Sequence, residues 1–258
     1  MKNKIKLIDW IREAIELLQE GKTRHLEEEV REIEDRIMRA QKKDRIALVN
    51  KGAVRISDLQ FYLNQEQPSV VHFSGHGSDE GEIILEDTVG NARAVPPEAL
   101  TRLFKNLKDS VNVVVLNACF SLEQAHAISQ HISCVVGMAS SITDEASIAF
   151  ASAFYLALAM EKSVREAFDQ GKTELALWRI QDENKPQLII REATDPSAVF
   201  LLQPKSTVAK AKAQATIKQE NGELVDCGYC KGTGRVHSPI SIFGEKCPVC
   251  GGVGKKRI

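Results

Sequence analysis

Hydrophobic residues follow two alternating patterns along this chain. Short runs that are apolar at consecutive positions are typical of strands covered on both faces, and segments with an apolar residue every three or four positions are typical of helices. The runs lie at residues 45–50, 69–74, 111–117 and 133–138, and the helical segments at 56–65, 97–107, 122–130, 143–160 and 164–180. Between the second and third runs, "EIILED" and "NARAV" predict a hairpin. The alternation predicts an α/β fold with a mostly parallel sheet and helices on both faces.

The first forty residues have helical spacing instead. Apolar side chains three or four residues apart predict a first helix and then a second one that ends near residue 42: Ile8, Ile11, Ile15 and Leu18, followed by Leu26, Val30, Ile33 and Ile37. A short strand over "KIKLI" is the less favoured alternative for the first of these. Within the second helix, the charged stretch "EEEVREIEDR" predicts a solvated face.

Composition sets the class of protein. The chain has 258 residues, 43% of them hydrophobic, which is enough to bury one substantial core and still carry a small appendage. No apolar run approaches the ~20 residues of a membrane helix, and the amphipathic, acid-bearing start differs from a secretion signal. We therefore expect a cytoplasmic protein that does not enter a membrane.

Charge is unevenly divided, although the formal net charge is only −1. Residues 205–258 carry ten Lys and Arg against four Asp and Glu, whereas the rest of the chain carries 24 against 31. A basic tail is compatible with a nucleic-acid partner, but Cys thiolates bound to a metal would offset part of this charge. A solvated linker over residues 205–224 is the favoured interpretation of its first part.

Two chemically reactive residues follow strands of the predicted sheet. His76 lies between two glycines in "SGHGS", and Cys119 follows "VNVVVLNA" at the turn into a helix, with Ser121 as a candidate N-cap. Catalytic groups of such sheets collect at the carboxyl ends of the strands, where the topology can bring both residues together. A thiolate nucleophile needs a proton donor for the leaving amine, and a His fits that role. The amides of Gly77 and Cys119 are candidates for the oxyanion site.

Each residue alone has a simpler interpretation, the Cys as packing and Gly-His-Gly as a turn. Their order is more specific, because the caspase His precedes the Cys by about 50 residues. Here the separation is 43 residues. Three blocks, "VVHFSGHGSDEGEIILED", "VVVLNACFSLEQAHAI" and "VVGMASSITDEASIAFASAFYLALAMEKSVREAF", resemble the CHAT branch of the caspase-like cysteine peptidases over about residues 24–202. The resemblance implies an endopeptidase with His76 as catalytic His and Cys119 as nucleophile, and gives His72 no catalytic counterpart.

The third block also suggests a specificity. In separase, a relative that cuts after arginine, a Thr-Asp follows the corresponding strand, and its Asp holds the basic side chain of the substrate. "ITDEAS" resembles it and places Asp144 there. A carboxylate is a suitable partner for a desolvated guanidinium. The equally weighted alternative is that Thr143 or Asp144 simply begins the next helix as its N-cap.

The start of the chain departs from the resemblance, because CHAT domains open with a β-strand where "LIDWIREAIELLQE" looks helical. A missing first strand predicts altered packing, and a helix that replaces it could dock a regulatory protein partner. This departure supports an alternative function, a non-catalytic interaction module with a vestigial or blocked dyad. The intact His76 and Cys119 favour a peptidase, which the resemblance further implies to be activated by a partner in a bacterial defence or regulatory system.

Four of the six cysteines form two Cys-x-x-Cys pairs in the tail, in "CGYCKGTG" and "CPVCGGVG". Two such pairs, 16 residues apart, can complete one tetrahedral, structural Zn²⁺ site, whereas a redox dithiol is the less favoured alternative. The predicted ligands are Cys227, Cys230, Cys247 and Cys250. These repeats resemble the zinc-binding region of DnaJ-type chaperones. Because this segment is too short to build a hydrophobic core, we expect the metal to hold it folded.

The sequence therefore predicts four parts. They are an N-terminal helical segment (1–23), a caspase-like peptidase domain (24–204), a linker (205–224) and a small Cys₄ zinc unit (225–258). The peptidase needs no cofactor for catalysis, and its expected partner is a protein substrate.

Overall fold

The chain divides into two compact units, Met1–Pro204 and Lys205–Ile258. The computed structural model describes residues 5–11, 22–40, 43–52, 54–75, 78, 80, 82–202, 224–226, 235–236, 245–246 and 255–257. Each unit is considered by itself below.

The first unit is built on a sheet in which six strands are described, in the order β2-β1-β3-β6-β7-β8. The strands are β1 (Ile5–Ile11), β2 (Ile46–Gly52), β3 (Val70–Ser74), β6 (Val113–Asn117), β7 (Cys134–Met138) and β8 (Pro186–Ile190). The first five run parallel, and β8 pairs antiparallel with β7 at the edge. The carboxyl ends of five strands therefore meet at one edge of the sheet.

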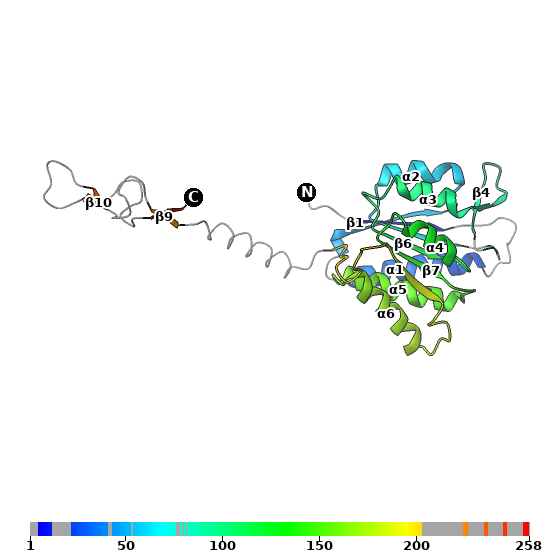
Figure 1. Cartoon of the computed structure of the whole chain (residues 1–258). Helices are drawn as coiled ribbons and strands as arrows, with labels where there is room; N and C mark the ends of the chain where they lie inside the picture. The colour runs from blue at the N-terminus through cyan, green and yellow to red at the C-terminus, as the bar shows by residue number, and fades with distance from the viewer. Residues whose placement is uncertain are drawn as a thin grey trace. The chain divides into compact units, whose positions relative to one another are not determined.

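Helices cover both faces of this sheet (Figure 1). One layer contains α1 (Lys22–Arg39), α5 (Asp144–Ala159) and α6 (Val164–Leu177), and the other contains α2 (Leu59–Glu66), α3 (Pro97–Lys105) and α4 (Leu122–Ser129). Two 3₁₀ turns, η2 (Lys43–Arg45) and η3 (Ile56–Asp58), and the hairpin of β4 (Ile83–Glu86) and β5 (Ala92–Val95) complete the unit. The expected α/β architecture, including the hairpin, is confirmed.

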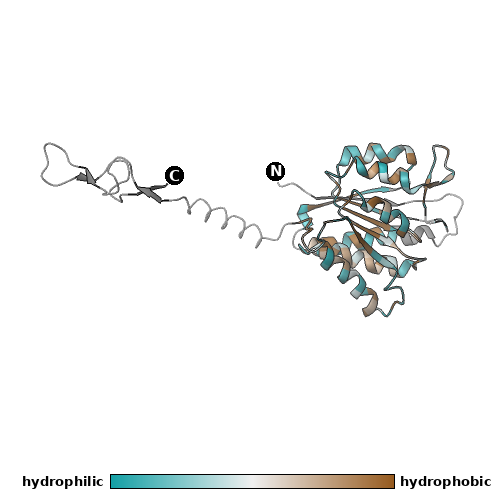
Figure 2. Cartoon of the chain, in the orientation of Figure 1, coloured by the Kyte–Doolittle hydropathy of each residue, from teal (hydrophilic) through white to brown (hydrophobic). Residues whose placement is uncertain are grey.

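The core follows from the two-residue period of the strands. On β6, Val113 and Val115 pack into the hydrophobic cluster under α1, α5 and α6, while Val114 and Leu116 pack into the cluster under α2, α3 and α4. Figure 2 shows the hydrophobic residues gathered on these central strands and on the helices beside them. A strand with both faces buried in this way is mostly apolar at consecutive positions, which is why β3, β6 and β7 were predictable.

The prediction of a helix at the start of the chain is wrong for residues 5–11. They form β1, which lies inside the sheet, with Ile8 paired to Val49 of β2 and to Val71 of β3. The sequence "IKLIDWI" has apolar residues at both odd and even positions, as an interior parallel strand requires, and backbone pairing on two sides outweighs the helical spacing. The first strand is therefore present, and residues 12–21 lie outside the described part.

One strand was not predicted. β8 is short, begins with Pro186 and is half-buried over most of its length, as suits an edge strand. The other strands and helices of the unit begin and end within three residues of their predicted bounds, and α1 ends at Arg39 as the pattern near residue 42 suggested.

The second unit contains four short strands among its described residues. β9 (Leu224–Asp226) pairs antiparallel with β12 (Lys255–Arg257), and β10 (Arg235–Val236) pairs antiparallel with β11 (Glu245–Lys246). The pairing is nested, the outer strands with each other and the inner strands with each other. Both Cys-x-x-Cys segments therefore connect the same two strand pairs in the chain, although the four cysteines lie outside the described residues.

Within the described residues, none of the helices has the length and apolar character needed to cross a lipid bilayer.

Candidate active site

The carboxyl ends of β3 and β6 lie side by side. The two strands are parallel neighbours, and their last paired residues are Ser74 and Asn117. Just beyond this pair, the amide of Gly75 donates to the carbonyl oxygen of Asn117 at 3.4 Å. The next residue after Gly75 is His76, which lies outside the described residues together with Gly77. The topology thus brings the segment that leads to His76 beside the segment that leads to Cys119.

Cys119 lies on the tight turn between β6 and α4 and is half-buried. Its Sγ is 3.5 Å from Oγ of Ser141, in the loop that follows β7. The next residue, Phe120, has φ of 57°, in the left-handed region that costs a residue with a Cβ about 1–2 kcal/mol. The strained turn sends the chain back into α4 at once and leaves the Cys119 thiol at the edge of the sheet.

Ser121 occupies the N-cap position of α4, as predicted, but its hydroxyl makes no cap hydrogen bond. The hydroxyl instead donates to the carbonyl oxygen of Leu116 and accepts from the amide of Met138, both at 3.0 Å. It therefore joins the ends of β6 and β7, where the paired residues of the two strands have ended at Val115. The turn that carries Cys119 is fixed to β7 by this buried side chain.

The loop after β7 is held by Asp182. This carboxylate accepts from the amide of Thr143 at 2.9 Å and from its hydroxyl at 3.0 Å, and it pairs with Lys185 at 2.8 Å. Burial alone would raise the pKa of Asp182, but the bonds from Lys185 and Thr143 outweigh it and lower that pKa. Asp182 stays ionised at neutral pH and keeps the loop beside Cys119 in place.

Asp144 is the first residue of α5 and is exposed. Thr143 acts as the N-cap, because its Oγ1 accepts from the amide of Ala146 at 3.3 Å. The alternative in which this pair begins a helix is thus realised in the structure. Thr143 and not Asp144 supplies this cap, and Asp144 lies three residues along the chain from Ser141, the neighbour of Cys119.

His72 is fully buried on β3, as expected for a histidine without a catalytic role. Its Nδ1 lies 2.9 Å from the hydroxyl of Tyr155, and its Nε2 lies 3.3 Å from Oε1 of Glu29. Glu29 corrects one prediction. It belongs to the charged stretch interpreted as a solvated face, yet it is only 2% exposed. It precedes Ile33 by four positions and so shares the buried stripe of α1.

Glu29, Asn117, Ser141 and Asp182 were missed by sequence reasoning. Only Glu29 carried a signal, its spacing from Ile33, and the others lie at strand ends or in loops where no period applies.

The second described cysteine shows what a structural thiol looks like in this fold. Cys134 is buried in β7, and burial raises its pKa to about 11. Such a thiol stays protonated at neutral pH. The two cysteines also differ in burial, because Cys134 is buried and Cys119 is only half-buried. Among the described residues, no three His, Cys, Asp or Glu side chains gather into a metal site.

Comparison with known proteins identifies the family of the chain. The family model of the CHAT domain matches residues 13–187, about two thirds of the chain. The chain belongs to the CHAT family. A curated CHAT relative, a Roc-COR-CHAT protease of an unknown prokaryotic organism, is 24% identical over 120 residues. The match covers 44% of this chain but only 11% of the relative, so the chain spans about a tenth of that protein's length.

Two solved structures are similar to this CHAT chain at low identity. The Arg specific cysteine proteinase gingipain R has a TM-score of 0.50 and 10% identity, over 76% of this chain and 47% of that one. The Drosophila initiator caspase Dronc has a TM-score of 0.48 and 7% identity, over 77% and 85% of the two chains. The expected caspase-like fold is confirmed by the family and by gingipain R.

Proposed function

We propose that this CHAT chain is a cysteine endopeptidase with Cys119 as nucleophile and His76 as its proton donor. The observation that carries the proposal is the position of an accessible thiol on the turn after β6, at the edge where β3 also ends. The first residue of α4, Leu122, follows Cys119 by three positions.

The chemistry needs no cofactor. The Cys119 thiolate attacks the scissile carbonyl, so that a carbon–sulfur bond forms and the carbonyl carries the negative charge. Backbone amides of Gly77 and Cys119 would stabilise this oxyanion. The carbon–nitrogen bond then breaks as His76 gives its proton to the leaving amine, and water hydrolyses the thioester to regenerate the thiol.

The proposal is tested by the reaction of Cys119 with a peptide acyloxymethyl ketone that carries arginine next to the electrophile. Stoichiometric labelling of the full chain is expected, and His76→Ala should abolish it. His126→Ala is the matched control, because His126 is an exposed histidine on α4 next to the site. Loss of labelling in both variants, or labelling that survives His76→Ala, contradicts the assignment.

We further propose that the peptidase cleaves after a basic residue and that Asp144 binds the basic side chain of the substrate. Its exposed carboxylate, on the loop and helix that border Cys119, is accessible to a substrate guanidinium. Gingipain R, an Arg specific proteinase by name, has the same fold. Asp144→Ala should lose the preference for an arginyl over a glutamyl peptide. Glu145→Ala, which removes the neighbouring exposed carboxylate of the same helical turn, should keep that preference.

For the tail we propose one structural Zn²⁺ bound by the two Cys-x-x-Cys segments. The nested pairing of β9 with β12 and of β10 with β11 supports it, because each segment joins one strand pair to the other. Four thiolates and no open position would give the metal a folding role. The unit is then a suitable surface for a regulatory protein partner, and the basic charge of the tail leaves nucleic acid as a weaker candidate.

The non-catalytic alternative has lost its main support, because it depended on a missing first strand and β1 lies inside the sheet. Residues 5–11 of the proposed docking segment form β1, and residues 12–21 lie outside the described part, so a regulatory partner at this segment stays a proposal. Activation of the peptidase by a partner, within a bacterial defence or regulatory system, is proposed on the family resemblance alone.

A further inference from the structure

A buried carboxylate lies directly beneath the proposed site and takes no part in the chemistry above. Glu29 projects from α1 and is 2% exposed. Its Oε2 accepts a hydrogen bond from the hydroxyl of Ser74, and its Oε1 accepts one from the side-chain amide of Asn117. These donors are the last residue of β3 and the last residue of β6, so one side chain binds the ends of both strands.

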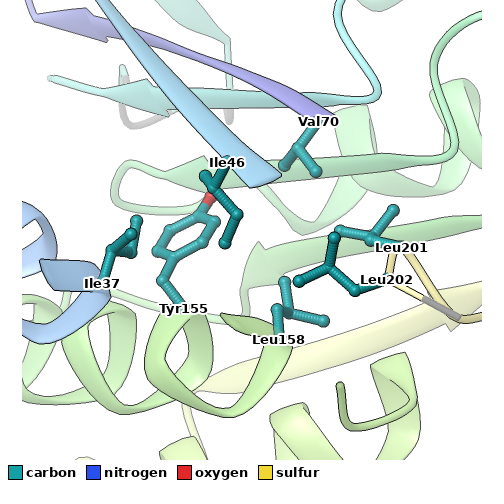
Figure 3. A pocket seen from close by; sticks show the side chains of 7 residues that line it. All are labelled: Ile37, Ile46, Val70, Tyr155, Leu158, Leu201 and Leu202. Carbon is teal, nitrogen blue, oxygen red and sulfur yellow. The ribbon is translucent and has the colours of Figure 1, made fainter. Parts of the chain in front are cut away.

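His72 and Tyr155 extend this cluster under the sheet. His72 lies between the Glu29 carboxylate and the Tyr155 hydroxyl, at the distances given above. Figure 3 shows Tyr155 rising from α5 toward the strands, among the apolar side chains of a small pocket that includes Ile37 and Val70. Partners on β3 and β6 contact both carboxylate oxygens of Glu29, which fixes the orientation of this carboxylate.

Glu29 carries a negative charge at neutral pH. Burial alone would raise its pKa, but the contacts with His72 and the hydrogen bonds from Ser74 and Asn117 together lower it. An ionised carboxylate accepts stronger hydrogen bonds than a neutral group does. The ends of β3 and β6 are therefore held by charge-assisted bonds and not only by the backbone.

The backbone by itself holds these ends weakly. The paired residues of β3 and β6 stop at Ser74 and Asn117, and the bond beyond them, from Gly75 to Asn117, is long at 3.4 Å. Two residues farther along the chain lie His76 and Cys119. His76 and Cys119 thus lie beyond the last backbone pair of β3 and β6, so the backbone pairing of the sheet does not by itself align them.

We propose that Glu29 is a positioning residue, whose buried carboxylate joins the last residue of β3 to the last residue of β6 and thereby aligns the chain that leads to His76 with the chain that carries Cys119. This inference rests on the proposed function for its catalytic consequence. The alignment of the two strand ends by Glu29 does not depend on whether the protein is a peptidase. A buried residue that only stabilised the core would leave the aligned reaction step unchanged once the protein is folded.

The test compares Glu29→Gln with Glu86→Gln in the full chain. Both glutamates are buried, at 2% and 3% exposure, and Glu86 lies on β4 of the hairpin, outside the cluster. Labelling of Cys119 by the arginyl acyloxymethyl ketone is resolved into the maximal rate constant and the inhibitor affinity. Glu29→Gln should lower the rate constant about 10- to 100-fold with little change in affinity, as a small misalignment does. Glu86→Gln should keep both.

An equal loss in both variants, or a loss of affinity alone, would overturn the assignment. Ser74→Ala keeps the inference testable if Glu29→Gln does not fold, because it removes only one of the donors to the carboxylate. It should also lower the rate constant, by a smaller factor. An unchanged rate constant in folded Ser74→Ala and Glu29→Gln would also overturn it.

Hydrogen–deuterium exchange separates this inference from the proposed function. Faster amide exchange is expected in Glu29→Gln at residues 74–75 and 117–119, and not in Glu86→Gln. Should the wild-type protein fail to label, the peptidase proposal fails, and the exchange alone then decides whether Glu29 aligns the strand ends. Unchanged exchange there would refute the alignment even in an active enzyme.

Discussion

Gly137 on β7 sets how closely α4 can approach the sheet. A Cβ at this position would lie 2.7 Å from the Cβ of Ala125, 3.1 Å from the carbonyl oxygen of Ser121 and 3.2 Å from the Cα of Leu122. Two of these atoms are backbone and the third is a Cβ fixed to it, so no flexible side chain can move aside. Gly137→Ala therefore forces the whole start of α4 away from β7.

The magnitude of this effect follows from two opposing terms. Burial of one added methyl stabilises the fold by about 0.8 kcal/mol. Overpacking of a close contact costs about 1–3 kcal/mol. The difference is about 0.2–2 kcal/mol, and because the contacted atoms cannot move aside we expect its upper half, about 1–2 kcal/mol, which lowers the Tm of a unit of this size by roughly 2–8 °C. The displaced end of α4 includes Ser121, so Cys119 should also label more slowly, by about 10-fold or more.

Gly171→Ala is the matched control. Its Cβ would lie 2.7 Å from ring atoms of Phe150, which is buried between α5 and α6 and away from α4. The variant should change the Tm, because the packed ring must shift, and should leave Cys119 labelling unchanged. The Tm and the labelling rate are measured by thermal unfolding and by the arginyl ketone. An unchanged Tm in Gly137→Ala would refute the packing argument, and equal labelling losses in both glycine variants would refute the link to Cys119.

Three further outcomes are expected. Since the folded-state pKa of Glu29 lies below its ordinary value of 4.5, its stabilisation is complete above that pH and is lost as the pH falls through the folded value. Urea unfolding at pH 7 and pH 3 should therefore show a smaller acid loss in Glu29→Gln than in the wild type, and an equal loss would contradict it. Ser163→Ala removes the hydroxyl that accepts from the amide of Glu166 at the start of α6, which should cost about 1 kcal/mol by thermal unfolding; no change would argue against this cap. Removal of Zn²⁺ by a chelator should abolish slow amide exchange in β9–β12 and leave the Tm of the first unit unchanged, whereas protected strands without metal would exclude a folding role.

The elements that were predictable from the sequence share one property. β3, β6 and β7 are apolar at consecutive positions because both faces are covered, and no surface helix has that pattern. β1 also lies inside the sheet, but Lys6 and Asp9 interrupt its apolar run, and its isoleucines happen to fall at helical spacing. Its assignment depends on the strands on either side, which are distant in sequence, so local periodicity could not supply it.

The candidate site also contains residues that were predictable from the sequence and residues that were not. Cys119 and the loop that contains Asp144 could be placed because they follow recognisable strands. The spacing of Glu29 from Ile33 could show that it is buried, but not that it lies at the site, since its role depends on partners 45 and 88 residues away. A charge within an acidic stretch is solvated in most helices, and only the fold turns this one toward the strand ends.

Three buried polar side chains have comparable roles along the edge that carries Cys119. Glu29 joins the ends of β3 and β6, Ser121 joins β6 to β7, and Asp182 joins the loop after β7 to the turn before β8. In each case a side chain adds hydrogen bonds at or beyond the ends of the strands, where backbone pairing stops. A parallel sheet must separate at its carboxyl edge to make room for a substrate, and the backbone there loses its partners. Side-chain hydrogen bonds hold the strand ends and loops of this edge in place where the backbone pairing has ended. The position of Cys119 thus depends on the whole edge, with Glu29 and Ser121 acting on the strand that leads to Cys119 and Asp182 on the loop beside it.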